Sequence, residues 1–125
     1  MRPYLIILYL FLLTIVGASA DGLNNSGVQT WGHLLEVIEV LGLFMVLIVF
    51  KLFTWRQVLL ALGSYICLRV FAFDYMYNIA AGNEVYYIGG SNWWDLVLSR
   101  QYPTGLLFGR VIFLITGVAI PIKHL

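Results

Sequence analysis

The sequence predicts an all-α integral membrane protein, a small bundle of three or four transmembrane helices with a short interfacial helix in an outer loop. Of the 125 residues, 62% are hydrophobic and only 10% are charged, whereas soluble domains carry about 25% charged residues. The mean hydropathy is +0.92, and the apolar residues fall into four long runs. So few charges cannot cover a soluble surface, and long apolar runs are typical of helices that cross a bilayer.

The first apolar run, 4–20, has two interpretations. Arg2 precedes it, and Ala18-Ser19-Ala20 has the small-residue pattern of a signal-peptide cleavage site. Residues 1–20 are therefore either a signal peptide or a first transmembrane helix, and the pattern favours the signal peptide. Under both interpretations the segment from Asp21 to Gly32 is expected to form a loop on the outer side, and 21–125 form a single membrane domain.

The other runs predict three transmembrane helices at about 34–53, 58–77 and 106–122. The first two have the length of about 20 residues that a helix needs to cross roughly 30 Å of hydrocarbon. The third is shorter but can still span. Pro121 lies near its end, where we expect it to bend or terminate the helix.

The basic residues indicate which end of the bundle is cytoplasmic. Lys51 and Arg56 flank the turn between two predicted spans, Lys123 follows the last span, and Arg2 precedes the first run. All four fall on one side if the chain crosses back and forth, and Lys and Arg are enriched in cytoplasmic loops. We therefore expect a cytoplasmic C-terminus in a bacterial inner membrane or a plasma membrane, with Arg100 as an exception in the outer loop.

The outer loop, 81–103, is rich in aromatic residues. We expect a short amphipathic helix at 93–100 lying in the membrane interface, because apolar residues recur there at helical spacing. Tryptophan and tyrosine anchor proteins at the level of the lipid headgroups. The alternative is that this loop docks a partner or forms the mouth of a cavity. The expected anchors are Tyr86, Tyr87, Trp93, Trp94 and Tyr102.

Charged residues also fall inside the predicted spans. Their depth can be counted from the cytoplasmic boundary at a rise of about 1.5 Å per residue. This count places Glu39, Arg69 and Arg110 in one layer on three helices, with Glu36 just above. A charge near the bilayer centre is costly unless it is paired or hydrated. We expect Arg69 to face Glu39 or Glu36, and Arg110 to lie against the span at 34–53. The predicted charge network therefore consists of Glu36, Glu39, Arg69 and Arg110.

This network, which has two acids and two arginines, has two interpretations. It either fixes helix packing or lines a polar cavity for an ion, a proton or a small anion. Asp74 lies nearer the outer surface, where we expect it to be hydrated or to cap a loop. Gly105 and Gly109 form a G-x-x-x-G pattern, which predicts close helix packing within the chain or in a homodimer.

The sequence predicts no catalytic, cofactor-binding or metal site, and we expect the protein not to be an enzyme. His33 shares a helical stripe with Glu36 and Glu39, but His124, the only other histidine, lies at the opposite side of the membrane. The single cysteine, Cys67, excludes an internal disulfide and a cysteine metal site. Lys and Arg do not cluster, so we expect no nucleic-acid partner.

The function that the sequence favours is association inside the membrane. The chain would act as an accessory or structural subunit of a membrane complex. Its expected partners are the lipid bilayer and either a membrane-protein partner or further copies of itself. The alternative is an oligomeric conductor of ions or small solutes that uses the Glu/Arg layer.

Overall fold

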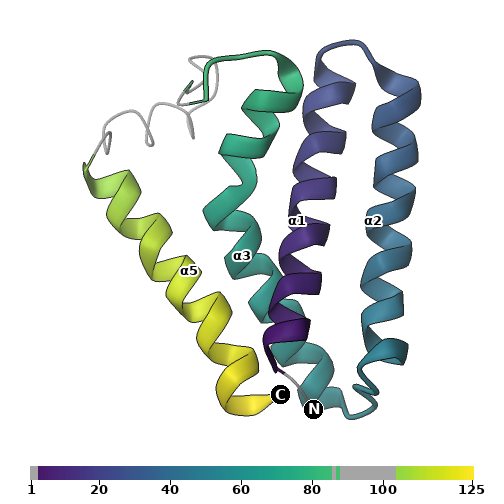
Figure 1. Ribbon diagram of the computed structural model, residues 1–125, viewed down its shortest axis with the longest axis vertical. Helices are drawn as coiled ribbons and strands as arrows, with labels where there is room; N and C mark the ends of the chain where they lie inside the picture. Colours follow the sequence, from purple (N-terminus) through teal and green to yellow (C-terminus); the bar gives the residue numbers. More distant parts are fainter. Residues whose placement is uncertain (1–2, 86, 88–103) are drawn as a thin grey trace.

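The computed structural model describes residues 3–85, 87 and 104–125. This part of the chain forms a bundle of four helices: α1 (Pro3–Asn25), α2 (Gln29–Val49), α3 (Trp55–Ala81) and α5 (Thr104–His124) (Figure 1). The helices run alternately up and down, so both termini and the α2–α3 connection lie at one end. Helices α1, α2 and α3 are long and apolar enough to cross a membrane. The all-helical bundle predicted from the sequence is therefore confirmed.

The helices α1 and α2 are longer than the sequence predicted at the end of the bundle opposite the termini, which is the predicted outer end. We expected the segment from Asp21 to Gly32 to form an outer loop, but α1 continues to Asn25 and α2 begins at Gln29. Polar residues of these added turns have partners in the bundle, and these contacts hold the backbone helical. The outer connection between α1 and α2 is correspondingly short.

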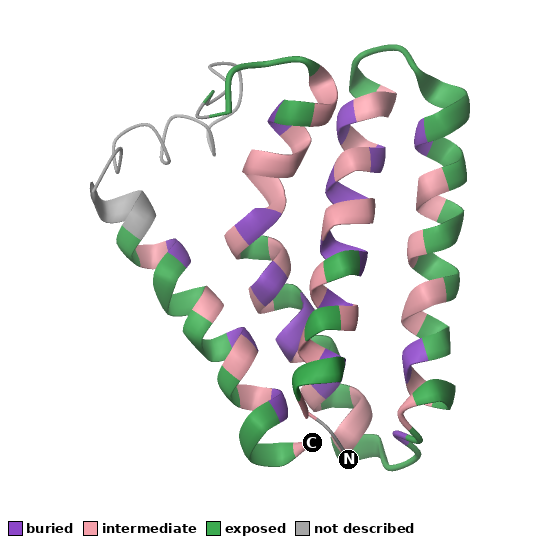
Figure 2. Cartoon of the chain, in the orientation of Figure 1, coloured by how far each residue is buried: buried purple, intermediate pink, exposed green. Residues whose placement is uncertain are grey.

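Helix α1 lies at the centre of the bundle. It packs against α2 on one side and against α3 on the other, while α5 packs mainly on α3. Ile6 and Leu10 of α1 and Leu68 of α3 are among the fully buried side chains. Figure 2 shows buried positions recurring along α1 and α3, whereas α2 is mostly exposed or intermediate. At lipid depth, the exposed apolar face of α2 would contact hydrocarbon or another protein.

Glycines allow α1 to approach its neighbours closely. A Cβ atom at Gly42 of α2 would overlap the side chain of Leu13, and one at Gly22 of α1 would lie 2.5 Å from the Tyr77 carbonyl oxygen. Small residues at such positions let helix backbones approach each other in membranes.

Helix α5 does not end at Pro121, although proline was expected to bend or terminate it. Proline has no N–H to donate to the carbonyl four residues earlier, which belongs to Gly117. In the structure, the Ser64 hydroxyl of α3 donates to this Gly117 carbonyl oxygen at 2.5 Å. A side chain of the neighbouring helix therefore replaces the missing backbone bond, as is common for prolines in membrane helices.

The predicted interfacial helix at 93–100 lies outside the described residues, as do four of the five aromatic anchors: Tyr86, Trp93, Trp94 and Tyr102. Tyr87 is described and is exposed. Its carbonyl oxygen accepts a hydrogen bond of 2.9 Å from the buried side-chain amide of Asn78, which also donates to the Val85 carbonyl. Asn78 therefore holds residues 85 and 87 against the outer end of α3.

Candidate functional site

Arg69 of α3 lies at the centre of a polar cluster that joins three helices. Its Nη1 atom donates to the Glu39 carboxylate of α2 and, at 2.7 Å, to the Tyr65 hydroxyl. Its Nη2 atom donates to the Asp21 carboxylate of α1 at 3.0 Å. The Tyr65 hydroxyl in turn donates to Glu39. One guanidinium therefore connects α1, α2 and α3, using the several fixed donors that make arginine suited to such networks.

The cluster crosses α1 at Gly17. A Cβ atom on Gly17 would overlap the Glu39 carboxylate and the Arg69 guanidinium. Helix α1 lies between α2 and α3 (Figure 1). Charged groups of α2 and α3 can therefore meet only by passing over the surface of α1. The absence of a side chain at Gly17 provides the space in which they do so.

Aromatic rings flank the guanidinium along α3. The Cζ atom of Arg69 lies 5.9 Å from the ring centroid of Tyr65 and 5.2 Å from that of Phe73. These residues lie one turn before and one turn after Arg69, on the same face of the helix. Ring faces attract cations, so the stripe stabilises the charge of Arg69.

The cluster is not sealed from its surroundings. The Glu39 side chain is only 13% exposed, whereas the side chains of Arg69 and Asp21 are 27% and 40% exposed. The exposed fraction of the side chains in the cluster therefore increases from Glu39 on α2 to Asp21 on α1. Within the cluster, two carboxylates face one guanidinium.

Arg110 of α5 belongs to a separate ion pair. It is 7% exposed and bonds to the Asp74 carboxylate of α3, with its Cζ atom 4.6 Å from the ring centroid of Tyr75. The sequence placed Arg110 against α2, but α5 packs on α3 and α1 instead. Although α5 diverges from α3 towards its N-terminal end (Figure 1), the long arginine side chain reaches Asp74, which we expected to be hydrated or to cap a loop.

Glu36 does not contact Arg69 either. Its carboxylate accepts a hydrogen bond of 2.6 Å from the Asn24 amide of α1 and lies 3.0 Å from Nδ1 of His33. Glu36 therefore joins the last turn of α1 to the second turn of α2. A Cβ atom on Gly32 would overlap the Asn24 amide, so a glycine again makes room for a polar contact.

The four residues of the predicted network are thus divided among three places. Only Glu39 and Arg69 meet, whereas Arg110 and Glu36 have other partners. The sequence reasoning missed Asp21, Asn24 and Tyr65, as well as the pairing of Asp74. Tyr65 could have been found from its position one turn before Arg69. Asp21 and Asn24 had been assigned to an outer loop.

The predicted G-x-x-x-G contact is not formed inside the described bundle at Gly109, where an added Cβ atom would meet no atom within 4 Å. The surroundings of Gly105 lie outside the part of the chain that the structure describes. The close approach between α5 and α3 occurs at Gly117, where a Cβ atom would lie 2.9 Å from Cγ of Leu68. The Gly109 position remains open for an intermolecular contact.

The described residues contain no group of three or more metal-ligating side chains that could hold a metal ion. Comparison of the chain with protein-family models, curated proteins and solved structures finds no match. The function is therefore inferred from the arrangement of the chain's own residues.

Proposed function

We propose that this chain is a small integral membrane protein that acts by association, without catalysis, as an accessory or structural subunit of a membrane complex. The observation that carries the proposal is the pairing of its interior charges with one another. Arg69 pairs with Glu39 and Asp21, and Arg110 pairs with Asp74. Charges satisfied in this way specify which helix faces meet. They leave the outer faces of α2 and α5 apolar and available to lipid or to another helix.

The distribution of basic residues supports an orientation with the C-terminus in the cytoplasm. Lys51 and Arg56 are exposed beside the α2–α3 connection, and Lys123 lies in the last turn of α5. Both termini lie at this same end (Figure 1). Enrichment of basic residues at one end is characteristic of the cytoplasmic side. The host membrane would be a bacterial inner membrane or a plasma membrane.

We further propose that α1 remains part of the working protein, although the sequence favoured a cleaved signal peptide at 1–20. The support comes from its packing. Among the described helices, α2 makes extensive contacts with α1 alone, and Gly17 provides the space for the Glu39–Arg69 pair. Removal of residues 1–20 would expose the apolar inner face of α2 and the buried side of Leu68.

Tryptophan substitution of exposed positions tests the association. Ile48 of α2 and Ile115 of α5 are 63% and 61% exposed, so a larger side chain at either site leaves the internal packing intact. The tagged chain, extracted in mild detergent, should elute with a larger membrane protein in a fixed ratio. One of the two variants should abolish this co-elution while retaining helicity. A chain that elutes alone, or whose co-elution survives both variants and further tryptophans along both faces, would contradict the proposal.

The unequal charges around Arg69 favour a second candidate, an oligomeric conductor of protons or cations. Two carboxylates face one guanidinium, and Asp21 is 40% exposed. Ion flux in liposomes that contain the purified chain, lost on Glu39→Gln and retained on Glu84→Gln, would support the conductor. Liposomes that remain tight exclude it.

A further inference from the structure

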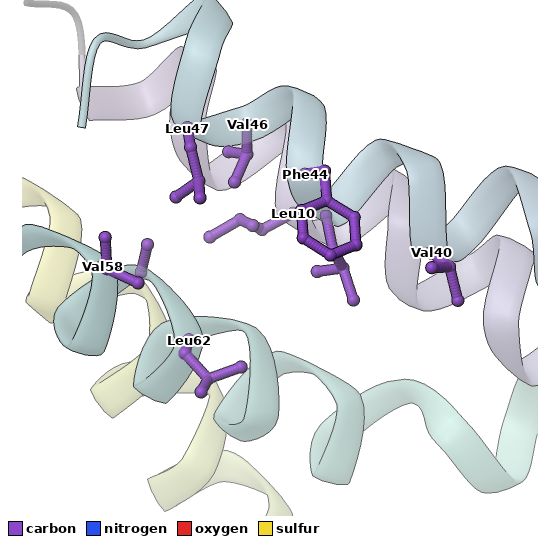
Figure 3. A pocket seen from close by; sticks show the side chains of 9 residues that line it. Leu10, Val40, Phe44, Val46, Leu47, Val58 and Leu62 are labelled. Carbon is purple, nitrogen blue, oxygen red and sulfur yellow. The ribbon is translucent and has the colours of Figure 1, made fainter. Parts of the chain in front are cut away.

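An apolar groove runs between α2 and α3 at the end of the bundle that carries the basic residues. It has a volume of about 220 Å³, and α1 forms its floor through Leu10 (Figure 3). Val40, Phe44 and Leu47 of α2 lie on one side, and Val58 and Leu62 of α3 lie on the other. The groove exists because α1 separates the two helices that form its walls.

The shape and lining of the groove favour an extended hydrocarbon chain. Its lining side chains are all apolar, and they come from three helices. A flexible hydrocarbon chain can follow it along α2 from Val40 to Leu47, a distance of about 10 Å.

Two exposed basic residues flank the α2–α3 connection, at the end of the bundle where the groove lies. Lys51 follows Leu47 by four residues, and Arg56 precedes Val58 by two. The sequence contains no aspartate or glutamate at 1–20, 40–73 or 104–125, the stretches that lie towards this end. In the part of the chain that the structure describes, no aspartate or glutamate side chain pairs with Lys51 or Arg56, so they complement an anionic group.

The backbone at Lys51 provides an independent observation. Helices α1, α2 and α3 end in the same hydrogen-bond pattern, in which one residue has positive φ and the next N–H bonds to a carbonyl five residues earlier. At the ends of α1 and α3 this residue is glycine, Gly27 and Gly82, whereas at the end of α2 it is Lys51 with φ 54°. A side chain in this conformation carries a conformational cost that glycine avoids. The presence of lysine, and not glycine, at this position points to a role for its charge.

We propose that this groove binds an anionic phospholipid, with one acyl chain between α2 and α3 and the phosphate at Lys51 and Arg56. Basic sites between helices on the cytoplasmic side are suited to such headgroups. The apolar walls bind the chain, and the two cations select the charge. This inference requires that the protein is inserted in a membrane, but it does not depend on the identity of any protein partner.

Native mass spectrometry of retained lipids tests the charge selection. The full chain is reconstituted in equal amounts of phosphatidylglycerol and phosphatidylcholine, and then extracted in mild detergent. We expect phosphatidylglycerol to be retained preferentially. Lys51→Gly should weaken this retention about fivefold, because each basic residue near an anionic surface contributes about that factor. The same substitution should raise thermal stability, because glycine suits the backbone at this position. Binding and stability therefore change in opposite directions, which a purely structural role of Lys51 would not produce.

Matched variants separate the groove from the general surface charge. Lys123→Gln removes a basic residue at the same end of the bundle but on α5, and should leave lipid retention unchanged. Leu62→Trp should fill the groove and abolish retention, whereas Leu59→Trp, at an equally exposed position on the same helix that does not line the groove, should not.

Several results would overturn this inference alone. They are equal retention of both lipids, an equal loss of phosphatidylglycerol retention on Lys123→Gln and on Lys51→Gly, and unchanged retention on Leu62→Trp. A dimer that Leu62→Trp dissociates would also overturn it, because a second copy of the chain would then occupy the groove. A chain that fails to float with the vesicles would overturn the proposed function as well.

Discussion

The contact between Arg69 and Glu39 predicts a specific pattern of stability changes. Arg69→Gln leaves the carboxylates of Glu39 and Asp21 close together without a counter-charge. Removing one partner of a buried ion pair costs about 3–5 kcal/mol. Because the Glu39 and Arg69 side chains are 13% and 27% exposed, we expect a smaller loss, about 2–3 kcal/mol. Glu39→Gln leaves Arg69 with Asp21, so we expect a loss of about 1–2 kcal/mol.

The double variant should cost less than the sum of the two single variants. We expect a coupling free energy of about 1–1.5 kcal/mol, within the upper range measured for polar pairs between membrane helices. Reversible unfolding of the reconstituted protein, followed by circular dichroism, measures all three values. Pairing Arg69→Gln with Glu84→Gln is the control, because Glu84 is exposed near the outer end of α3, and this pair should be additive. Additivity of the Glu39 and Arg69 changes within about 0.5 kcal/mol would refute the reasoning.

Three further predictions concern packing around the cluster and along α5. Gly17→Ala should lower the free energy of unfolding by about 2 kcal/mol through overpacking. Gly109→Ala, with open space at its Cβ position, should leave this free energy unchanged or raise it by up to about 1 kcal/mol. Equal effects of the two variants in the same unfolding assay would contradict the assigned contacts. Ser64→Ala should cost about 1–2 kcal/mol because it leaves the buried Gly117 carbonyl oxygen without its donor. Adding Pro121→Ala should recover much of that loss by restoring the backbone N–H, and a loss that persists in the double variant would show that Ser64 acts in another way. A chain expressed without residues 1–20 should fail to accumulate in membranes, and membrane fractionation showing normal levels would argue against a central role for α1.

The sequence was sufficient to predict the helical bundle, because apolar runs of spanning length have few alternatives to a helix in a membrane. It was less informative about where the helices end. Helix α1 extends beyond position 20 through Asp21 to Asn25 because these polar residues contact Arg69 and Glu36 on other helices. Such long-range contacts cannot be recognised from local composition.

The candidate site was predicted only in part, for a related reason. Counting residues along each helix estimates depth, and it brought Glu39 and Arg69 to the same level. It does not establish which helices are neighbours. Arg110 was estimated to lie at the level of Glu39, but α5 packs on α3 and α1, so its partner is Asp74. The space at Gly17, without which α2 and α3 could not exchange charges across α1, has no signature in hydropathy.

The most direct test of this account is native mass spectrometry of the chain extracted gently from its own membrane. The account predicts a subunit that retains residues 1–20, held in a complex with a larger membrane protein. A subunit that lacks residues 1–20 would remove Gly17 and the central helix from the working protein. An assembly of this chain alone would favour the conductor over the accessory subunit, and either result would contradict the account.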